Sequence, residues 1–208
     1  MVNSEDFSPW RTSVWEGSDA ELLRWAIPLY FPNAPAPPPI LDATYGSGRF
    51  WKGTTWRVEG LDILPTGSIR ANNQMIPFKD EVFGVVVFDP PHMAERHIGK
   101  DYGGLMGLYQ SAHERNSSVP LFTPFLLEAA RVLFHGGILL AKITDNVHRG
   151  VQQWEHIAFI SAVRDVGLIP CDLIIKVRKG PMMDPKWKNQ YHVRKRHCFW
   201  VVARKGWC

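Results

Sequence analysis

The stretch Val82–His92 reads VFGVVVFDPPH, an apolar run that ends in an acid, two prolines and a histidine. The part through Phe88 is rich in β-branched and aromatic side chains and includes no charged residue. Such a run is typical of a strand covered on both faces of a parallel sheet. It predicts a central strand with Asp89 at its carboxyl end. In open α/β sheets that end borders the crevice in which ligands bind, so we expect Asp89 to face a ligand.

Strand-like and helix-like segments alternate along the rest of the chain. The predicted order is a helix behind Ser18, strands Pro39–Ala43, Trp56–Ile63 and Val82–Phe88, a helix Phe122–Leu133, a strand Ile138–Ile143, a helix Trp154–Val166, and strands Leu168–Val177 and Cys198–Arg204. This alternation predicts an α/β fold built on a doubly wound sheet. The last two strands have no helix between them, so we expect them to pair antiparallel.

The length of 208 residues suits one domain with a sizeable core. We divide it into an amino-terminal arm, helix and proline connector over residues 1–38, a cofactor and catalytic core over 39–175, and a basic carboxyl-terminal hairpin over 176–208. The helix is predicted from the capping-box spacing of Ser18 and Glu21, and the connector from the prolines of Pro32–Pro39. Gly167 follows the later helix Trp154–Val166 and is predicted to end it in a left-handed conformation.

Composition excludes several classes of protein. No run of about eighteen apolar residues occurs, and the amino terminus lacks a signal-peptide pattern, so we expect a cytoplasmic protein without a membrane span. Cys171, Cys198 and Cys208 have no ligand-like spacing and the histidines form no cluster. We therefore expect neither a disulfide framework nor a metal site.

Basic residues concentrate at the carboxyl end. The net charge is +4, yet the segment from Lys176 onward holds ten basic residues and one acid, Asp184, so the preceding part is acidic overall. A basic stretch on an acidic body is typical of a protein that meets phosphates. A solvated, lysine-rich strand pair is the alternative interpretation.

A glycine-rich turn follows the first predicted strand. Leu41–Phe50 reads LDATYGSGRF, in which Gly46 and Gly48 permit a tight turn and close approach to a ligand. Asp62 follows Asp42 by twenty residues, at the end of the second predicted strand, where a carboxylate can accept hydrogen bonds from a ribose diol. An ordinary tight turn would explain the glycines alone, but the pair of features favours a nucleoside-containing cofactor.

The Asp-Pro-Pro turn presents acceptors only. Proline lacks an amide donor and fixes its own φ angle, so Asp89 and Pro90 offer a carboxylate and a rigid carbonyl. These groups suit a planar amino group, which has two hydrogens to be held while its nitrogen attacks a methyl group.

Asp42–Phe50, Asp62 and Asp89–His92 together resemble the S-adenosylmethionine-dependent amino-methyltransferases that make N6-methyladenine, N4-methylcytosine or N2-methylguanine. The cofactor turn and the D/N/S-P-P-aromatic motif of that family have this order and spacing. The resemblance implies a Rossmann-like class I methyltransferase fold, with a mostly parallel seven-stranded sheet, an antiparallel last strand and helices on both faces. It also implies S-adenosylmethionine as the cofactor.

In this interpretation each motif has a role. The catalytic residues are Asp89, Pro90, Pro91 and His92. The cofactor-binding residues are Asp42, Ala43, Thr44, Gly46 and Gly48 for the amino-acid portion, Asp62 and Ile63 for the ribose and its surroundings, Asn72 or Asn73 for the adenine edge, and Trp15 for the methionine end. The nucleic-acid contacts are Lys179, Lys186, Trp187, Lys188, Arg194, Lys195 and Arg196, basic residues with an aromatic among them.

The predicted substrate is a base in DNA, turned out of its stack beside Asp89. An acid at the head of the motif favours adenine N6 over cytosine N4. Two departures from the family pattern are His92, where Tyr, Phe or Trp is usual, and Asn72 or Asn73, where an acid is usual. An RNA base, cytosine N4 in DNA and a catalytically silent cofactor-binding subunit remain alternatives, and a homodimer or a specificity partner is compatible with each.

Overall fold

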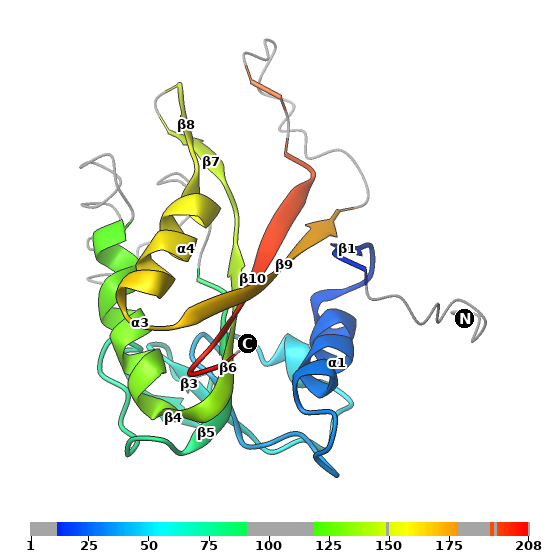
Figure 1. The fold of residues 1–208 in the computed structure, drawn as a ribbon, viewed down its shortest axis with the longest axis vertical. Coiled ribbons are helices and arrows are strands. Elements are labelled where there is room, and N and C mark those ends of the chain that lie inside the picture. The colour runs from blue at the N-terminus through cyan, green and yellow to red at the C-terminus, as the bar shows by residue number, and fades with distance from the viewer. Residues whose placement is uncertain (1–11, 91–118, 149, 179–191, 194, 208) are drawn as a thin grey trace, which may run out of the picture.

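The computed structural model describes residues 12–90, 119–148, 150–178, 192–193 and 195–207. Their strands form an eight-stranded sheet in the order β1-β9-β10-β6-β5-β2-β3-β4, and β7 and β8 form a separate two-stranded sheet (Figure 1). The strands are β1 Val14–Trp15, β2 Ile40–Asp42, β3 Val58–Asp62, β4 Ile69–Arg70, β5 Phe83–Phe88, β6 Leu133–Ile143, β7 Asn146–His148, β8 Val151–Gln153, β9 Ile169–Val177 and β10 His197–Arg204.

The sheet is mostly parallel, as the sequence predicts. β5 lies between β2 and β6 and is parallel to both, and all six of its residues are buried. β10 is antiparallel to both of its neighbours, β6 and β9. The expected number of seven strands was wrong by one, because β1 adds a short edge strand parallel to β9. Two residues are too few to show the alternation from which a strand is predicted.

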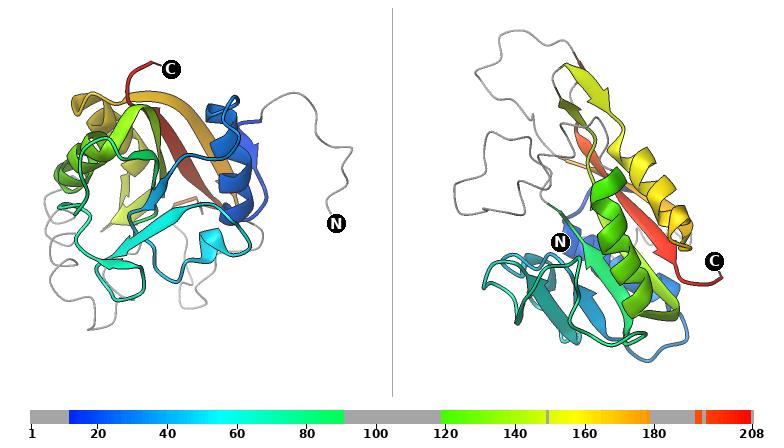
Figure 2. Two further views of the ribbon diagram at one scale, coloured as in Figure 1. Left: turned by 90° about the horizontal axis from the view of Figure 1, so that it is seen from below. Right: turned by 90° about the vertical axis from the view of Figure 1, so that its left-hand side faces the viewer.

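Helices cover both faces of the sheet (Figure 2). The helix α1 (Asp19–Tyr30) packs on one face through Leu22, Leu23, Ala26 and Ile27. On the other face lie α3 (Val119–Val132) and α4 (Glu155–Asp165), with Phe125 and Phe159 in the core. In the strands, odd and even residues alternate between these two cores, so Val85 and Val87 face α1 whereas Val86 and Phe88 face α3.

Local signals set the ends of two helices. Ser18 and Glu21 form the predicted capping box at the start of α1. Gly167 follows α4 with a φ of +82°, a left-handed conformation that glycine adopts without strain. Both ends are confirmed as predicted.

Three local features differ from expectation. β6 begins at Leu133, directly after α3, and not behind Gly136-Gly137, because the chain enters the sheet with a register shift opposite Phe83 and Val85. The β7–β8 hairpin was not predicted, since a strand of three residues is too short to show an alternation of apolar and polar side chains. Cys171 is disulfide-bonded, whereas Cys198 is free and buried; the spacing of cysteines along a chain does not report which thiols folding brings together.

Within the described residues, every helix is too short or too polar to cross a lipid bilayer. The same part of the chain holds no group of three acidic, histidine or cysteine side chains arranged to bind a metal ion.

Candidate functional site

Three aspartates lie at the carboxyl ends of three adjacent strands. Asp42 ends β2, Asp62 ends β3, and Asp89 follows β5 directly. β2 pairs in parallel with both β3 and β5, so the three acids share one edge of the sheet. This is the edge at which parallel α/β sheets bind ligands.

The glycine-rich turn is bound to the end of β3. The amide of Gly46 donates a 2.7 Å hydrogen bond to Oδ2 of Asp62, and the amide of Tyr45 donates to the carbonyl of Leu61. Gly48 has a φ of +66°, and a Cβ there would lie 2.6 Å from the Tyr45 hydroxyl oxygen. Gly48 therefore has both a conformational and a steric reason to be glycine.

Asp42 lies beneath the turn. Its side chain is buried, and its two oxygens accept hydrogen bonds from the Thr44 amide at 3.0 Å and from Nε1 of Trp51 at 2.7 Å. Burial raises the pKa of Asp42 to about 7, against the opposing effect of these two hydrogen bonds. The structure thus gives Asp42 a supporting role, in which it fixes the backbone of the turn that a ligand would meet.

Asp62 and Ile63 lie at the surface of the same edge. The Asp62 carboxylate accepts from the Gly46 amide and, at 2.9 Å, from the Leu64 amide. A carboxylate has about four acceptor positions, so this one can still accept from a diol. The Ile63 side chain is 38% exposed beside it.

The Asn73 side chain hydrogen-bonds the glycine-rich turn, whereas the Asn72 side chain hydrogen-bonds within its own segment. Nδ2 of Asn73 donates to the carbonyl of Ala43 at 3.3 Å, whereas Oδ1 of Asn72 accepts from the amide of Gln74 at 2.9 Å. Of the two, Asn73 has the more direct link to the candidate cofactor site.

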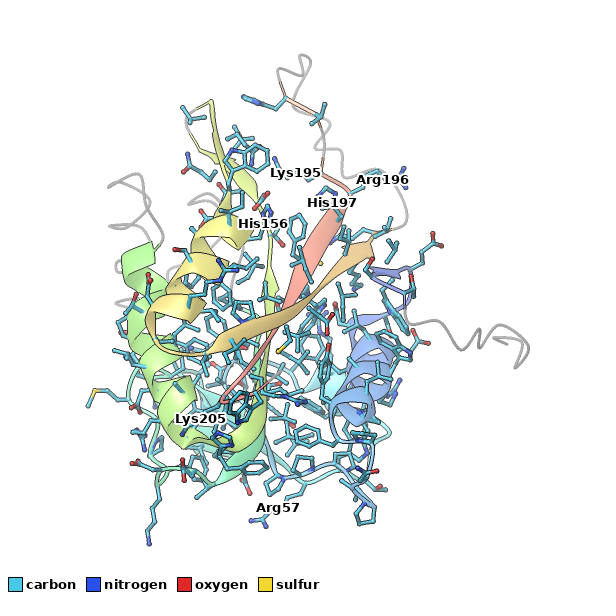
Figure 3. All side chains as sticks on the ribbon, in the orientation of Figure 1. Arg57, His156, Lys195, Arg196, His197 and Lys205 are labelled. Carbon is cyan, nitrogen blue, oxygen red and sulfur yellow. The ribbon has the colours of Figure 1, made fainter. Side chains whose placement is uncertain are left out.

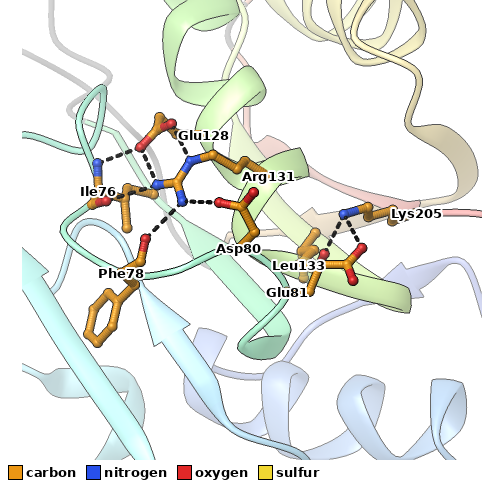
Figure 4. Close-up of polar contacts among 8 residues, drawn as sticks. All are labelled: Ile76, Phe78, Asp80, Glu81, Glu128, Arg131, Leu133 and Lys205. Atoms are coloured by element: carbon orange, nitrogen blue, oxygen red, sulfur yellow. Dashed lines mark hydrogen bonds and ion pairs between the residues drawn. The ribbon is translucent and has the colours of Figure 1, made fainter.

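Arg131 of α3 anchors this segment (Figure 4). Its guanidinium donates to the carbonyls of Ile76 at 2.9 Å and Phe78 at 2.8 Å and pairs with Glu128, whose carboxylate accepts from the Ile76 amide. Such a forked set of charge-assisted bonds orders the chain that leads from β4 to β5.

Asp89 is joined to the glycine-rich turn and to strand β6. Its amide donates a 2.7 Å hydrogen bond to Oγ1 of Thr44, and its Oδ2 accepts from Nζ of Lys142 at 3.0 Å. Pro90 is buried next to it. Pro91 and His92 lie outside the described residues, so their predicted catalytic roles stay predictions.

Lys142 and Asp19 are residues of this site that the sequence interpretation missed. Lys142, on β6, bonds Asp89 and also Oδ2 of Asp19 at 3.1 Å, and Asp19 is the first residue of α1. One signal was present in the sequence, because lysine is unusual in a strand as apolar as Ile138–Ile143. Its partners could not be identified, since Asp19 lies 123 positions away.

Trp15 is not brought to the cofactor turn. It belongs to β1, and four strands separate β1 from β2 in the sheet. Its indole packs on Trp25 with ring centroids 5.3 Å apart and donates to the carbonyl of Ser18. In the structure Trp15 secures the start of α1, and its predicted contact with the cofactor stays a prediction.

Of the predicted nucleic-acid contacts, Lys179, Lys186, Trp187, Lys188 and Arg194 lie outside the described residues. Lys195 and Arg196 lie with His156 and His197 at one end of the molecule, opposite Arg57 and Lys205 (Figure 3). Lys195 donates to the side chain of Gln152 on β8, and Arg196 is exposed. These two basic residues therefore lie toward the end of the sheet at which β6 leads into the β7–β8 hairpin.

No family model matches the chain, and no curated protein matches it in sequence. Solved structures do match. A 1,6-didemethyltoxoflavin-N1-methyltransferase from Burkholderia thailandensis superposes with a TM-score of 0.55 at 12% identity, over 91% of this chain and 79% of the other. A SAM-dependent methyltransferase from Methanosarcina mazei superposes with a TM-score of 0.53 at 13% identity, over 86% and 97%. This chain has the class I methyltransferase fold.

A third match concerns DNA. A candidate DNA modification methylase from Thermus thermophilus, solved with S-adenosyl-L-methionine, gives a TM-score of 0.44 at 18% identity over 64% of this chain. The present chain spans about half the length of that protein, 49%. A superposition of this quality carries no argument about substrate. The class I fold explains why the three aspartates meet at one edge, but the chemistry has to be argued from the side chains.

Proposed function

We propose that this chain is an S-adenosylmethionine-dependent methyltransferase that acts on the exocyclic amino group of a base in DNA, most favourably adenine N6. The observation that carries the proposal is the hydrogen bond between the Asp89 amide and Thr44. It joins the acceptor-only Asp-Pro-Pro turn to the glycine-rich turn. An amine held at the first turn would therefore lie next to a cofactor held at the second.

The residues of the turn fit the cofactor. Among the described residues, a Cβ on Gly46 would meet only the Thr44 carbonyl oxygen, at 3.9 Å, so the backbone there is open to a ligand. Asp62 lies at the end of the adjacent strand with acceptor positions for a ribose diol. Ile63 and Asn73 would border the adenine, and the segment Ala43–Gly48 the amino-acid portion. When bound, the cofactor supplies an electrophilic methyl group on a sulfonium.

Asp89 and Pro90 do the positioning in this proposal. The carboxylate and the proline-flanked carbonyl accept the two N–H hydrogens of the target, which directs the nitrogen lone pair at the methyl carbon. A bound cofactor would supply its methyl group to this nitrogen, and one of the nitrogen's two protons would then leave to solvent. Placement of this kind accounts for several powers of ten in rate.

Basic residues support a nucleic-acid substrate. Lys195 and Arg196 lie at one end of the fold together with His156 and His197, and cations of this kind neutralise phosphates. An RNA base is the second candidate, because phosphate contact does not distinguish the two polymers. His92 would lie against the base, and an imidazole stacks over a smaller area than the usual tyrosine or tryptophan.

The test is methyl transfer from labelled S-adenosylmethionine to duplex DNA, single-stranded DNA and RNA, followed by digestion and mass spectrometry of the nucleosides. We expect labelled N6-methyldeoxyadenosine from DNA. Label in an RNA nucleoside only would select the second candidate, and label in neither polymer would contradict the proposal.

A further inference from the structure

A lysine lies inside the sheet next to the candidate catalytic acid. Nζ of Lys142 is 3.0 Å from Oδ2 of Asp89 and 3.1 Å from Oδ2 of Asp19. The Lys142 side chain is only 10% exposed, and those of Asp89 and Asp19 are 20% and 16% exposed. Two acids on different elements thus share one nearly buried cation.

Asp19 is itself held in place by residues of two further strands. Its Oδ2 is 2.8 Å from Nζ of Lys176 on β9, and its Oδ1 accepts from Nε1 of Trp200 on β10 at 3.0 Å. Trp200 is the register partner of Lys142. The network therefore runs from β9 through the start of α1 to the end of β5, and each of its members has fixed partners.

The charge on Lys142 is maintained by these acids. Burial lowers the pKa of Lys142, but Asp89 and Asp19 act in the opposite direction, and the net effect raises that pKa. The lysine is therefore a cation at neutral pH. The same interaction acts on its partners with opposite sign, so it favours the ionised form of each acid. For Asp19 the pKa is lowered, although burial alone would raise it.

We propose that Lys142 is the positioning residue for Asp89, and that it holds the carboxylate as a correctly oriented anion through an ion-pair network anchored on Asp19. The inference rests on the proposed function, since it gives Asp89 the target amine to hold. An anionic acceptor favours the reaction because the attacking nitrogen gains positive charge as its bond to carbon forms. A neutral or rotated carboxyl at this position would lose that benefit.

The charges around Asp89 make the role of Lys142 specific. From β2, Asp42 lies close enough to interact electrostatically with Asp89, and Asp62 interacts in turn with Asp42. Asp19, on α1, is a further negative charge and is paired with Lys142. Lys176, on β9, is a positive charge and is paired with Asp19. Among the described ion pairs, Lys142 is the cation in direct contact with Asp89.

The test compares Lys142→Met and Lys142→Gln with Lys205→Met. Lys205 also bridges an acid, Glu81, at 3.0 Å, but pairs outside this network, so it controls for the loss of a partly buried lysine. We expect both Lys142 variants to lose at least roughly tenfold in kcat while the cofactor Kd changes less than threefold. Their activity should also require a higher pH, with the acid limb of kcat moved to higher pH, because Asp89 loses its cation. Unchanged kcat and an unchanged acid limb would overturn the proposal.

A second measurement reads Asp89 without any turnover. Carbon-13 NMR of labelled aspartate carboxyls, with Asp89→Asn to assign the resonance, follows its titration in the wild type and in Lys142→Gln. We expect the Asp89 midpoint to lie at higher pH in the variant than in the wild type, because the paired cation is gone. An unmoved midpoint contradicts the inference even if methyl transfer is found, whereas a moved midpoint in a protein that methylates nothing upholds the ion pair and rejects only the proposed function.

Asp19→Asn separates electrostatics from general damage to the fold. This change removes a negative charge from the network and leaves the pair of Lys142 and Asp89 intact. The acid limb should then stay in place or move to lower pH, opposite to its movement in the Lys142 variants. A shift to higher pH in Asp19→Asn would show that disruption of the network, and not the charge of Lys142, controls Asp89.

Discussion

The amide of Asp89 donates a 2.7 Å hydrogen bond to Oγ1 of Thr44, across 45 positions of sequence. One residue follows the central strand β5, and the other belongs to the glycine-rich turn behind β2. This side-chain contact joins the two motifs that the sequence marks as functional, next to the backbone pairing of β2 with β5. The account of this protein as an amino-methyltransferase depends on that link.

Thr44→Val should uncouple the two turns. Valine has the same shape but no acceptor, so the Asp89 amide loses its partner at a cost of about 1–3 kcal/mol in unfolding free energy. We expect lower stability in urea and a reduced kcat. Thr54→Val is the matched control, because the Thr54 hydroxyl donates locally to the Trp51 carbonyl. If the two variants had the same kcat, the link would have no functional role.

Asp42 should make stability depend on pH. Its folded pKa of about 7 lies above the ordinary value of 3.8, so the folded protein binds this proton more tightly than the unfolded chain. The resulting stabilisation is complete below the ordinary pKa and is lost as the pH rises through 7, a loss on the order of 4 kcal/mol. Urea unfolding of wild type and Asp42→Asn from roughly pH 4 to pH 8 measures it. The wild type should weaken relative to the variant over this range, and a constant difference would show that Asp42 does not titrate there.

Asp62→Ala should weaken cofactor binding. The carboxylate orients the Gly46 amide and is the proposed acceptor for the ribose, and loss of charge-assisted hydrogen bonds costs about 1.5–3 kcal/mol. We expect the Kd for S-adenosylmethionine in calorimetry to rise by about tenfold or more. Asp165→Ala, which removes an exposed acid at the end of α4, should leave it unchanged. Equal affinities in the two variants would remove Asp62 from the cofactor site.

Arg131→Met should weaken cofactor binding from a distance. The guanidinium holds the Ile76–Phe78 backbone, and through it the segment that carries Asn73 to the Ala43 carbonyl (Figure 4). We expect a several-fold higher Kd and faster amide exchange over residues 72–78. Lys205→Met is the matched control, since Lys205 pairs with Glu81 and does not bond that segment. Unaltered exchange in Arg131→Met would show that the segment is ordered by other contacts.

The sequence predicted the parts of the fold that local chemistry determines. The all-apolar run of β5, the capping box of α1 and the glycine behind α4 each carry their own signal, and each lies where it was expected. Asp62 and Gly46 were both singled out, and the structure joins them directly. Their place in the site follows from strand ends, which a parallel sheet brings to one edge.

The parts that failed depend on contacts distant in sequence. Lys142 and Asp19 become neighbours only when α1 docks on the sheet, and no spacing rule connects them. β1, which carries Trp15, pairs with β9 from the other end of the chain, and no local pattern indicates that partner. Strands of two or three residues, such as β1 and β7, are held by their partners and not by their own composition.

The most direct test of the central claim is single-turnover methyl transfer by Asp89→Ala, with the cofactor Kd measured on the same preparation. The account predicts that transfer to DNA falls below detection while the Kd stays within a few-fold of the wild-type value, because Asp89 holds the target amine and not the cofactor. Transfer at the wild-type rate in this variant would contradict the role of Asp89 and, with it, the proposed reaction.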